Sequence, residues 1–151
     1  RVTDITSLPL VGGQEVCAAS YKGRIACFDM TTGQTTWARD VSSLTGMDID
    51  SRTAYVSDDQ GNVLAFDRHG GASLWKQGKL FNRNLSRPLA IGAYVLVGDY
   101  QGYVHVLRRD DGAIVGRIAT DGSAIVADPR RIGDNVLVQT KDGGLFSIAV
   151  N

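Results

Sequence analysis

The chain has 151 residues, 43% of them hydrophobic, which is enough for one domain with a buried core. Lys and Arg together number 16, as do Asp and Glu, so the formal net charge is zero. A neutral chain lacks the basic surface on which non-specific nucleic-acid binding depends. It also lacks the basic excess that holds a polybasic segment on an anionic membrane. We therefore expect neither nucleic acid nor a charged membrane surface as a partner.

The composition predicts many short strands. The chain has 18 glycines and only 3 prolines, and its apolar residues occur in short runs separated by Gly, Asp, Asn and Ser. Runs of this kind, bounded by turn residues, are typical of β-strands. No run approaches the length of about 18 apolar residues that a transmembrane helix needs, and neither a helical pattern nor a signal peptide is evident. The sequence therefore predicts an all-β fold.

Four segments of the chain repeat one pattern. They are residues 16–40 (VCAASYKGRIACFDMTTGQTTWARD), 54–78 (AYVSDDQGNVLAFDRHGGASLWKQG), 95–119 (VLVGDYQGYVHVLRRDDGAIVGRIA) and 136–151 (VLVQTKDGGLFSIAVN). Anchor glycines spaced by 38, 41 and 41 residues occupy one position of the repeat, namely Gly23, Gly61, Gly102 and Gly143. Ten residues further on, the first three segments have Gly33, Gly71 and Gly112, and four residues after these stand Trp37, Trp75 and Gly116. A period near 40 residues with strand patterning predicts propeller blades rather than helical hairpins.

Each unit reads, in chain order, as four strands, which we call A to D. Strand A is predicted at residues 8–11, 47–49, 89–91 and 125–127, and in the third unit strands B to D are predicted at 94–97, 103–107 and 113–119. The fourth unit stops before a strand D, so the total is fifteen strands. The prediction is an all-β β-propeller of about four four-stranded antiparallel blades, at about 1–42, 43–79, 80–120 and 121–151.

The two cysteines lie in the first unit. A two-residue hairpin turn at Lys22-Gly23 would set Cys17 opposite Phe28, so that Cys17 and Cys27 would point to opposite faces of the sheet. On this register we expect two free, buried cysteines, with a disulfide as the alternative. The cysteines and the two histidines do not have the spacing of a zinc site.

The longest predicted connection is the segment KLFNRNLSRP, which joins the second and third units. It places Arg83 and Arg87 together with Phe81 and Leu85 in a loop position. A binding loop and an ordinary loop that packs its own apolar residues are equally compatible with this pattern.

Other sequence signals of catalysis are weak. The chain has no GxGxxG that opens a helix, no Walker lysine and no GxSxG nucleophile elbow. His105 lies in a predicted strand and is expected to be a packed or edge residue, while His69 lies in a turn and is expected to be solvated. We therefore predict no catalytic, cofactor-binding or metal-binding residue.

The segment from Gly23 to Trp37, GRIACFDMTTGQTTW, resembles the signature GxxxALDxxTGxxxW of PQQ-type repeats, and the segment from Gly61 to Trp75 fits nearly as well. The resemblance implies that Trp37 and Trp75 dock between blades, against a turn of the neighbouring blade. The third copy has Arg108 in place of Asp and Gly116 in place of Trp. We expect its blade interface to be packed differently.

Over its whole length the chain is most similar to the C-terminal half of proteins of the BamB family. The similarity lies in AASYKGRIACFDMTTGQ, in LFNRNLSRP followed by VLVGDYQGYVH, and in VQTKDGGLFSI. It implies an eight-bladed propeller on the periplasmic face of the bacterial outer membrane, held there by an N-terminal lipid anchor that these residues do not include. It also implies a non-catalytic scaffold of the outer-membrane β-barrel assembly (BAM) complex that binds the POTRA domains of BamA.

In that family, an acidic pair in a loop entering one blade contributes to the BamA contact. The matching segment here is RVTDIT, in which Asp4 keeps the first acid and Thr6 replaces the second. The resemblance therefore implies partner-binding residues at Asp4, Ile5 and Thr6, with the replacement at Thr6 weakening the contact.

The alternative function is a fragment of a PQQ-dependent quinoprotein dehydrogenase, because such enzymes share the repeat. These enzymes need a calcium site and usually a vicinal pair of cysteines, whereas Cys17 and Cys27 are separate. The carboxylates of Asp48, Asp50, Asp58 and Asp59 do not have the spacing of an EF-hand loop and are interpreted as turn and surface groups.

Half of a ring would leave an uncovered sheet face at each end, and large apolar faces are poorly tolerated in water. We therefore expect two copies of the isolated chain to close an eight-bladed ring around a two-fold axis.

Overall fold

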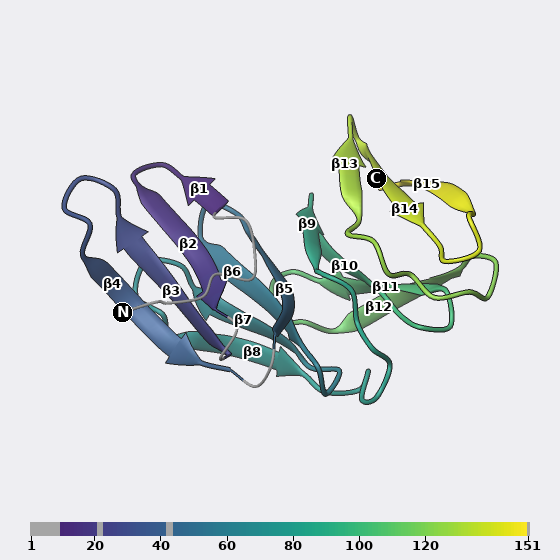
Figure 1. The fold of residues 1–151 in the computed structure, drawn as a ribbon, viewed down its shortest axis with the longest axis horizontal. Coiled ribbons are helices and arrows are strands. Elements are labelled where there is room, and N and C mark those ends of the chain that lie inside the picture. The colour runs from purple at the N-terminus through teal and green to yellow at the C-terminus, as the bar shows by residue number, and fades with distance from the viewer. Residues whose placement is uncertain (1–9, 21–22, 42–43, 151) are drawn as a thin grey trace.

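The computed structural model describes residues 10–20, 23–41 and 44–150, which form fifteen strands in four separate antiparallel sheets (Figure 1). Blade 1 consists of β1 (Leu10–Gly12), β2 (Glu15–Ser20), β3 (Arg24–Asp29) and β4 (Thr35–Asp40). Blade 2 consists of β5 (Leu44–Ile49), β6 (Thr53–Asp58), β7 (Val63–Asp67) and β8 (Ser73–Gln77). Blade 3 consists of β9 (Leu89–Ile91), β10 (Tyr94–Gly98), β11 (Tyr103–Arg108) and β12 (Ile114–Ala119). Blade 4 consists of β13 (Arg130–Ile132), β14 (Asn135–Gln139) and β15 (Leu145–Ala149).

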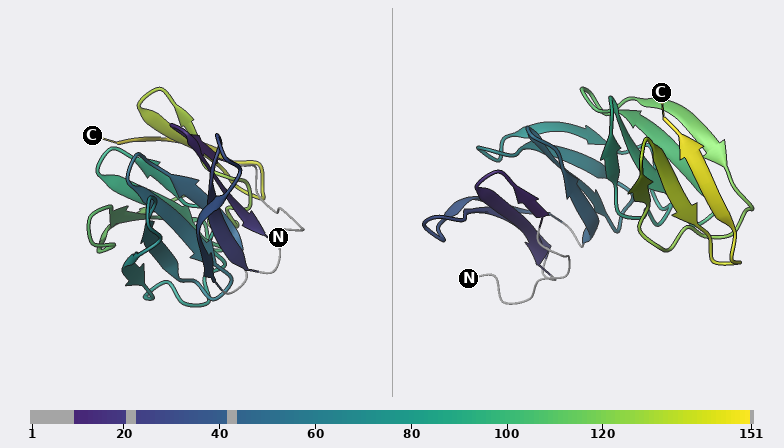
Figure 2. Two further views of the ribbon diagram at one scale, coloured as in Figure 1. Left: turned by 90° about the vertical axis from the view of Figure 1, so that its left-hand side faces the viewer. Right: turned by 90° about the horizontal axis from the view of Figure 1, so that it is seen from above.

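The predicted all-β propeller fold is confirmed. Each sheet is a simple meander, because its strands pair in the order in which they follow one another along the chain. The described residues contain no helix, and therefore none with the length and hydropathy needed to cross a membrane. Seen from above, the sheets follow one another as an arc (Figure 2).

One predicted strand is wrong. Strand A of the fourth unit is β13 at Arg130–Ile132, whereas residues 125–127 form only an isolated bridge between Ile125 and Thr140. The Ile125 N–H donates to the carbonyl of Asp99, and its side chain lies directly over the Cα of Gly98 in blade 3. Ile125 therefore anchors the connection onto blade 3, and the strand of blade 4 begins after it.

Three apolar layers hold neighbouring blades together. The first includes Ile25 and Trp37 of blade 1 and Val56 of blade 2, and the second includes Tyr55 of blade 2 and Val95 of blade 3. The third combines Leu96 and Val104 of blade 3 with Val136, Val138 and Ile148 of blade 4. Because strand residues alternate between faces, each central blade contributes one face to each of two layers.

Tryptophan and glycine meet at the first two of these interfaces. The indole N–H of Trp37 donates to the carbonyl of Arg68, and that of Trp75 donates to the carbonyl of Arg109. The rings cover Gly71 and Gly112, where an added Cβ would lie 2.6 and 2.3 Å from ring atoms. These glycines also have φ angles of +74° and +75°, so both the turn and the close approach of the indole require them.

The interface between blades 3 and 4 is built without tryptophan. Ile125 fills the space over Gly98, and Gly116 lies across from Val106 on the strand that carried tryptophan in the first two units. The apolar layer there consists of aliphatic side chains together with Tyr94. The third interface is thus packed by a residue of the connection rather than by a residue of strand D.

Substituting Gly71 by Ala tests the docking of Trp37, with Gly33→Ala as the matched control. Both glycines occupy the same turn position, with φ of +74° and +70°, but an added Cβ meets nothing within 4 Å at Gly33. Both changes should cost about 1 to 2 kcal/mol of backbone strain. Gly71→Ala should cost a further 1 to 3 kcal/mol or so because it displaces the indole. Urea unfolding measures the difference, and equal losses would contradict the proposed docking role.

Candidate functional site

The meander places the turns of every blade on two opposite rims of the arc. Because consecutive strands run in opposite directions, the A–B and C–D turns share one edge, and the B–C turns share the other edge with the connections between blades. The first rim comprises residues 13–14, 30–34, 50–52, 68–72, 92–93, 109–113 and 133–134. The second rim comprises, in the described part of the chain, residues 23, 41, 59–62, 78–88, 99–102, 120–129 and 140–144.

The connection formed by residues 78–88 is the longest loop of the second rim in the described residues. Its Leu80 and Leu85 side chains are buried in the layer between blades 2 and 3. Phe81, in contrast, is 63% exposed. The loop therefore packs Leu80 and Leu85, as the ordinary-loop interpretation expects, and the binding-loop interpretation stays a prediction.

Backbone hydrogen bonds fix this loop to the turns of blades 2 and 3. The N–H of Asn82 donates to the carbonyl of Gln60, and the N–H of Ser86 donates to the carbonyl of Gly98. Asn82 has a φ of +59°, a left-handed conformation that Asn tolerates better than other side chains do. The exposed Phe81 is thus carried on a backbone held at both ends of the loop.

A buried carboxylate ties the same loop to blade 3. The side chain of Asp99 is inaccessible to solvent, and its Oδ2 lies 3.0 Å from the guanidinium of Arg83 and 2.7 Å from Nε2 of His105. Its Oδ1 accepts the N–H groups of Gln101 and Tyr103 at 2.8 and 3.0 Å. Burial by itself raises the pKa of Asp99, but the hydrogen bonds from His105, Tyr103 and Gln101 outweigh burial and hold the pKa below its ordinary value of 3.8.

Arginine side chains join neighbouring blades on the first rim. Arg68, in the C–D turn of blade 2, donates to the carbonyl of Gly12 in blade 1 and to that of Asp50 in its own blade. Arg109 occupies the same repeat position in blade 3 and lies 3.4 Å from the carboxylate of Asp50. Each guanidinium therefore contacts the A–B turn of the preceding blade.

An open cleft of about 400 Å³ lies on the first rim between blades 2 and 3. Trp75 and Leu74 form its apolar part, and charged residues of both signs surround them. The lining residues are Asp50, Ser51, Arg52, Thr53, Asp67, His69, Leu74, Trp75, Arg109 and Asp110. Burial by itself raises the pKa of Asp50. Hydrogen bonds from the Tyr55 side chain and from the backbone of Arg52 and Thr53 outweigh burial and hold the pKa below its ordinary value, so the group remains a carboxylate.

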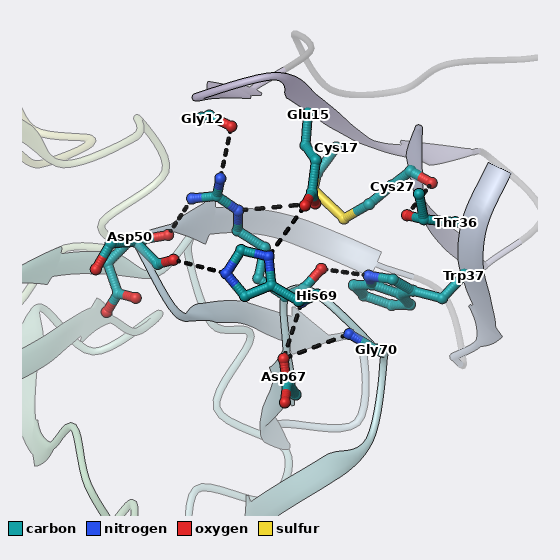
Figure 3. The surroundings of a disulfide bond; sticks show 12 residues. Gly12, Glu15, Cys17, Cys27, Thr36, Trp37, Asp50, Asp67, His69 and Gly70 are labelled. Carbon is teal, nitrogen blue, oxygen red and sulfur yellow. Dashed lines mark hydrogen bonds and ion pairs between the residues drawn. A yellow bond between two sulfur atoms is a disulfide. The ribbon is translucent and has the colours of Figure 1, made fainter. Parts of the chain in front are cut away.

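The expectation of two free cysteines is wrong, because Cys17 and Cys27 form a disulfide (Figure 3). The register of β2 and β3 sets Cys17 directly opposite Cys27, and Val16 opposite Phe28. Ser20 pairs with Arg24, so three residues separate the strands rather than the two that we assumed. A shift of one residue moves a side chain to the other face of a sheet, which is why the assumed turn placed the two sulfurs apart.

The disulfide lies beside a small group of charged residues that joins blades 1 and 2. Nδ1 of His69 lies 3.0 Å from the carboxylate of Glu15, and Nε2 lies 3.2 Å from the carbonyl of Ser51. The other carboxylate oxygen of Glu15 and Nε of Arg68 are 3.9 Å apart, and both atoms are buried without a hydrogen-bond partner. Figure 3 shows Glu15 between the imidazole and the disulfide.

Glu15, Cys17 and Cys27 also form the one trio of potential metal ligands in the described residues. The two sulfurs are bonded to each other, however, and a metal binds the thiolate form of cysteine. Arg68 adds a positive charge on the other side of Glu15. The residues in this arrangement do not fit a cation site.

The residues predicted from sequence fall into three groups. Asp4, Ile5 and Thr6 lie outside the described residues. The anchor glycines Gly23, Gly61, Gly102 and Gly143 lie at the B–C turns with φ between +79° and +90°, and Gly33, Gly71 and Gly112 lie at the C–D turns. His105 is buried against Asp99, whereas the His69 side chain is 60% exposed although it contacts Glu15.

Sequence reasoning did not find the Asp99 cluster, the arginine contacts on the first rim or the disulfide. Only the disulfide had a usable signal, since a three-residue turn makes Cys17 and Cys27 symmetric about the hairpin. The cluster joins Arg83 to a blade that follows it, and nothing in the local pattern indicates this pairing.

The repeated antiparallel meanders define a PQQ-type β-propeller, and the indole rings of the first two blades dock on glycines of the next blade. The family model for "Outer membrane protein assembly factor BamB" matches residues 1–77. The chain belongs to this BamB family.

Relatives and solved structures agree with this assignment. The chain is 44% identical over its full length to the outer membrane protein assembly factor BamB of Bordetella pertussis, and it spans 39% of that protein. The crystal structure of BamB from Moraxella catarrhalis is similar with a TM-score of 0.83 and 35% identity over 93% of the chain and 42% of that structure. The computationally designed Ika4 protein, at 15% identity, shares the fold alone, with a TM-score of 0.84 over 100% of this chain and 98% of its own. The chain thus spans about two fifths of the natural relatives it matches.

The lowered pKa of Asp99 predicts that the folded protein loses stability in acid. Because its folded pKa is depressed, Asp99 stabilises the fold above its unfolded value of 3.8, and this contribution is lost as the pH falls through the folded value. Asp99→Asn should lower the free energy of unfolding by about 3 kcal/mol at pH 7, because Arg83 and His105 lose a buried carboxylate.

Urea unfolding between pH 7 and pH 2 measures this effect. The difference between the two proteins should shrink below pH 3.8. Asp59→Asn, at an exposed turn position of blade 2, is the control and should change the free energy of unfolding by less than about 0.5 kcal/mol. A constant difference across the pH range would contradict the role of Asp99.

Proposed function

We propose that this chain is part of a non-catalytic scaffold subunit of the BAM complex, which binds the POTRA domains of BamA and supports folding and insertion of outer-membrane proteins. The observation that carries the proposal is membership of a family named for outer membrane protein assembly. This membership associates the chain with the outer membrane, on its periplasmic side. The disulfide agrees with an oxidising compartment of this kind.

A rigid rim with an exposed aromatic side chain supports a binding role. The layers between blades fix the turns relative to one another, and the loop of residues 78–88 holds Phe81 outward on an anchored backbone. A pre-organised aromatic residue loses little entropy on binding, and such residues often carry a large share of the binding energy. We propose Phe81 as a contact on the second rim, in addition to Asp4, Ile5 and Thr6, which the family resemblance suggests.

A quinoprotein dehydrogenase is not favoured. The relatives that the chain matches are named as assembly factors, in agreement with a non-enzymatic role. The two cysteines are joined across a hairpin inside a blade interface, unlike the vicinal pair expected beside the cofactor.

The binding proposal predicts that purified BamA POTRA domains retain the wild-type protein in a pull-down. Asp4→Arg and Phe81→Ser should each weaken binding by about tenfold or more, which corresponds to the loss of one good contact. Asp134→Arg, a charge reversal at an exposed turn of the first rim, should bind as the wild type does.

If Asp4→Arg or Phe81→Ser leaves binding unchanged, the substituted residue is not part of the binding site. Binding that is lost equally in all three variants, or a wild-type protein that POTRA domains do not retain, would overturn the proposed partner. Circular dichroism of each variant checks that the sheets remain folded.

We also propose that the isolated 151-residue chain forms a homodimer that closes an eight-bladed ring. Among the described blades, blades 1 and 4 each have a sheet face with no neighbouring sheet. In blade 1 this face carries Val11, which is 65% exposed, and Phe28. In blade 4 it carries Ile132 and Leu145, which are 57% and 65% exposed. Wherever two described blades are neighbours, the sheet face that is uncovered in blade 4 packs on the sheet face that is uncovered in blade 1. A second copy related by a two-fold axis can therefore cover both faces.

Light scattering with size exclusion tests the homodimer. The expected mass is twice that of the 16.2-kDa chain. Leu145→Asp should shift the population toward monomer, because it places a charge in the new layer, while Val115→Asp, at a comparably exposed position on β12, should not. A strictly monomeric wild type would contradict the proposal.

A further inference from the structure

The disulfide belongs entirely to one hairpin. Cys17 and Cys27 are separated by 10 residues and face each other in the register of β2 and β3. Once these two strands pair, the sulfurs are neighbours whether or not any other blade is folded. Hairpins form in about 1 to 10 microseconds, well before contacts between distant segments are complete.

The finished interface seals the same bond from solvent. Both cysteines have an exposed fraction of 0%. They belong to the apolar layer that also contains Trp37 of blade 1 and Met47, Val56 and Phe66 of blade 2. Thiol–disulfide exchange needs a nucleophilic sulfur to reach a sulfur of the disulfide, so an exchange partner has no access after blade 1 has packed on blade 2.

These two facts fix an order of events. The bond cannot be made by a large oxidant after the interface closes, and the hairpin already provides the geometry before it closes. We propose that the β2–β3 hairpin is the substrate of a disulfide-donor oxidant during maturation, and that this oxidant forms the Cys17–Cys27 bond before blade 1 packs on blade 2.

The Cys17–Cys27 bond forms by thiol–disulfide exchange with the donor in two steps. The thiolate of one cysteine, formed by loss of its proton to water, attacks a sulfur of the donor disulfide and breaks the donor S–S bond. The second cysteine, also deprotonated, then attacks the mixed disulfide. Cys17 and Cys27 lose two electrons together, and the donor leaves as a dithiol that has gained two electrons and two protons.

The sealing part of the proposal is tested by reduction of the oxidised chain with dithiothreitol, followed by maleimide labelling after unfolding. The native disulfide should be reduced more than about tenfold slower than the same bond in 6 M urea, because reduction requires opening of the interface. Met30→Cys in a background with Cys17→Ala and Cys27→Ala provides an exposed thiol on blade 1, since Met30 is 54% exposed. This control thiol should label at the same rate with and without urea. Equal reduction rates in both conditions would overturn the sealing.

The order of events is tested by adding oxidised glutathione either at the start of refolding of the reduced chain or after refolding is complete. If the reduced chain reaches the native near-ultraviolet dichroism, late oxidation should be more than about tenfold slower than early oxidation. If it does not reach that state, late oxidation should restore it, which equally supports bond formation before closure. A reduced chain that folds fully and is oxidised late as fast as early would overturn the proposal, as would free thiols in the chain purified from an oxidising compartment. Neither outcome depends on BamA binding, so this test is independent of the proposed function.

Discussion

Packing of one blade's sheet on the next is the interaction on which the rest of this molecule depends. A single four-stranded meander has two apolar faces and cannot bury either one alone, so each blade is stable only with a neighbour. The indole rings of Trp37 and Trp75 give the first two layers a fixed alignment, because each ring lies on a glycine of the next blade and donates to the adjacent carbonyl. The third layer reaches the same arrangement with Ile125 over Gly98. The tryptophan is therefore one solution to the packing problem rather than a requirement of the fold.

The polar contacts at the rims convert this packing into a rigid surface. Arg68 and Arg109 each contact the A–B turn of the preceding blade, and Asp99 holds Arg83 of the 78–88 loop against blade 3. The ion pair to the buried Asp99 adds little net stability, but it penalises every arrangement in which the carboxylate is left unpaired. A loop so constrained can present Phe81 in one position, which suits a protein whose family is named for assembling other proteins rather than for a reaction.

Formation of the Cys17–Cys27 disulfide depends on an oxidising compartment. It joins adjacent strands of one blade, so it does not link blades to each other. Its effect on the arc comes through the first layer, in which both sulfurs are packed. A bond made in a hairpin and then buried between two blades requires the oxidant to act before the first interface closes. The two cysteines are fully buried although their blade lies at one end of the described arc (Figure 2), because blade 2 covers them.

The sequence by itself determined the number of blades, the positions of most strands and the glycines of the turns, because these features follow from local patterning repeated about every 40 residues. What only the tertiary structure decided are choices between faces and between distant partners. One extra residue in the first hairpin turn brought Cys17 and Cys27 to the same face, and a pattern of alternating residues carries no information about the length of such a turn. The sequence predicted a strand at residues 125–127 because Ile125 is apolar and β-branched, yet the Ile125 side chain fills the space above Gly98. Asp99 and His105 lie in one hairpin of blade 3, and Arg83 reaches them because the 78–88 loop folds back on that blade. A loop that folds back in this way has no periodic pattern in the sequence.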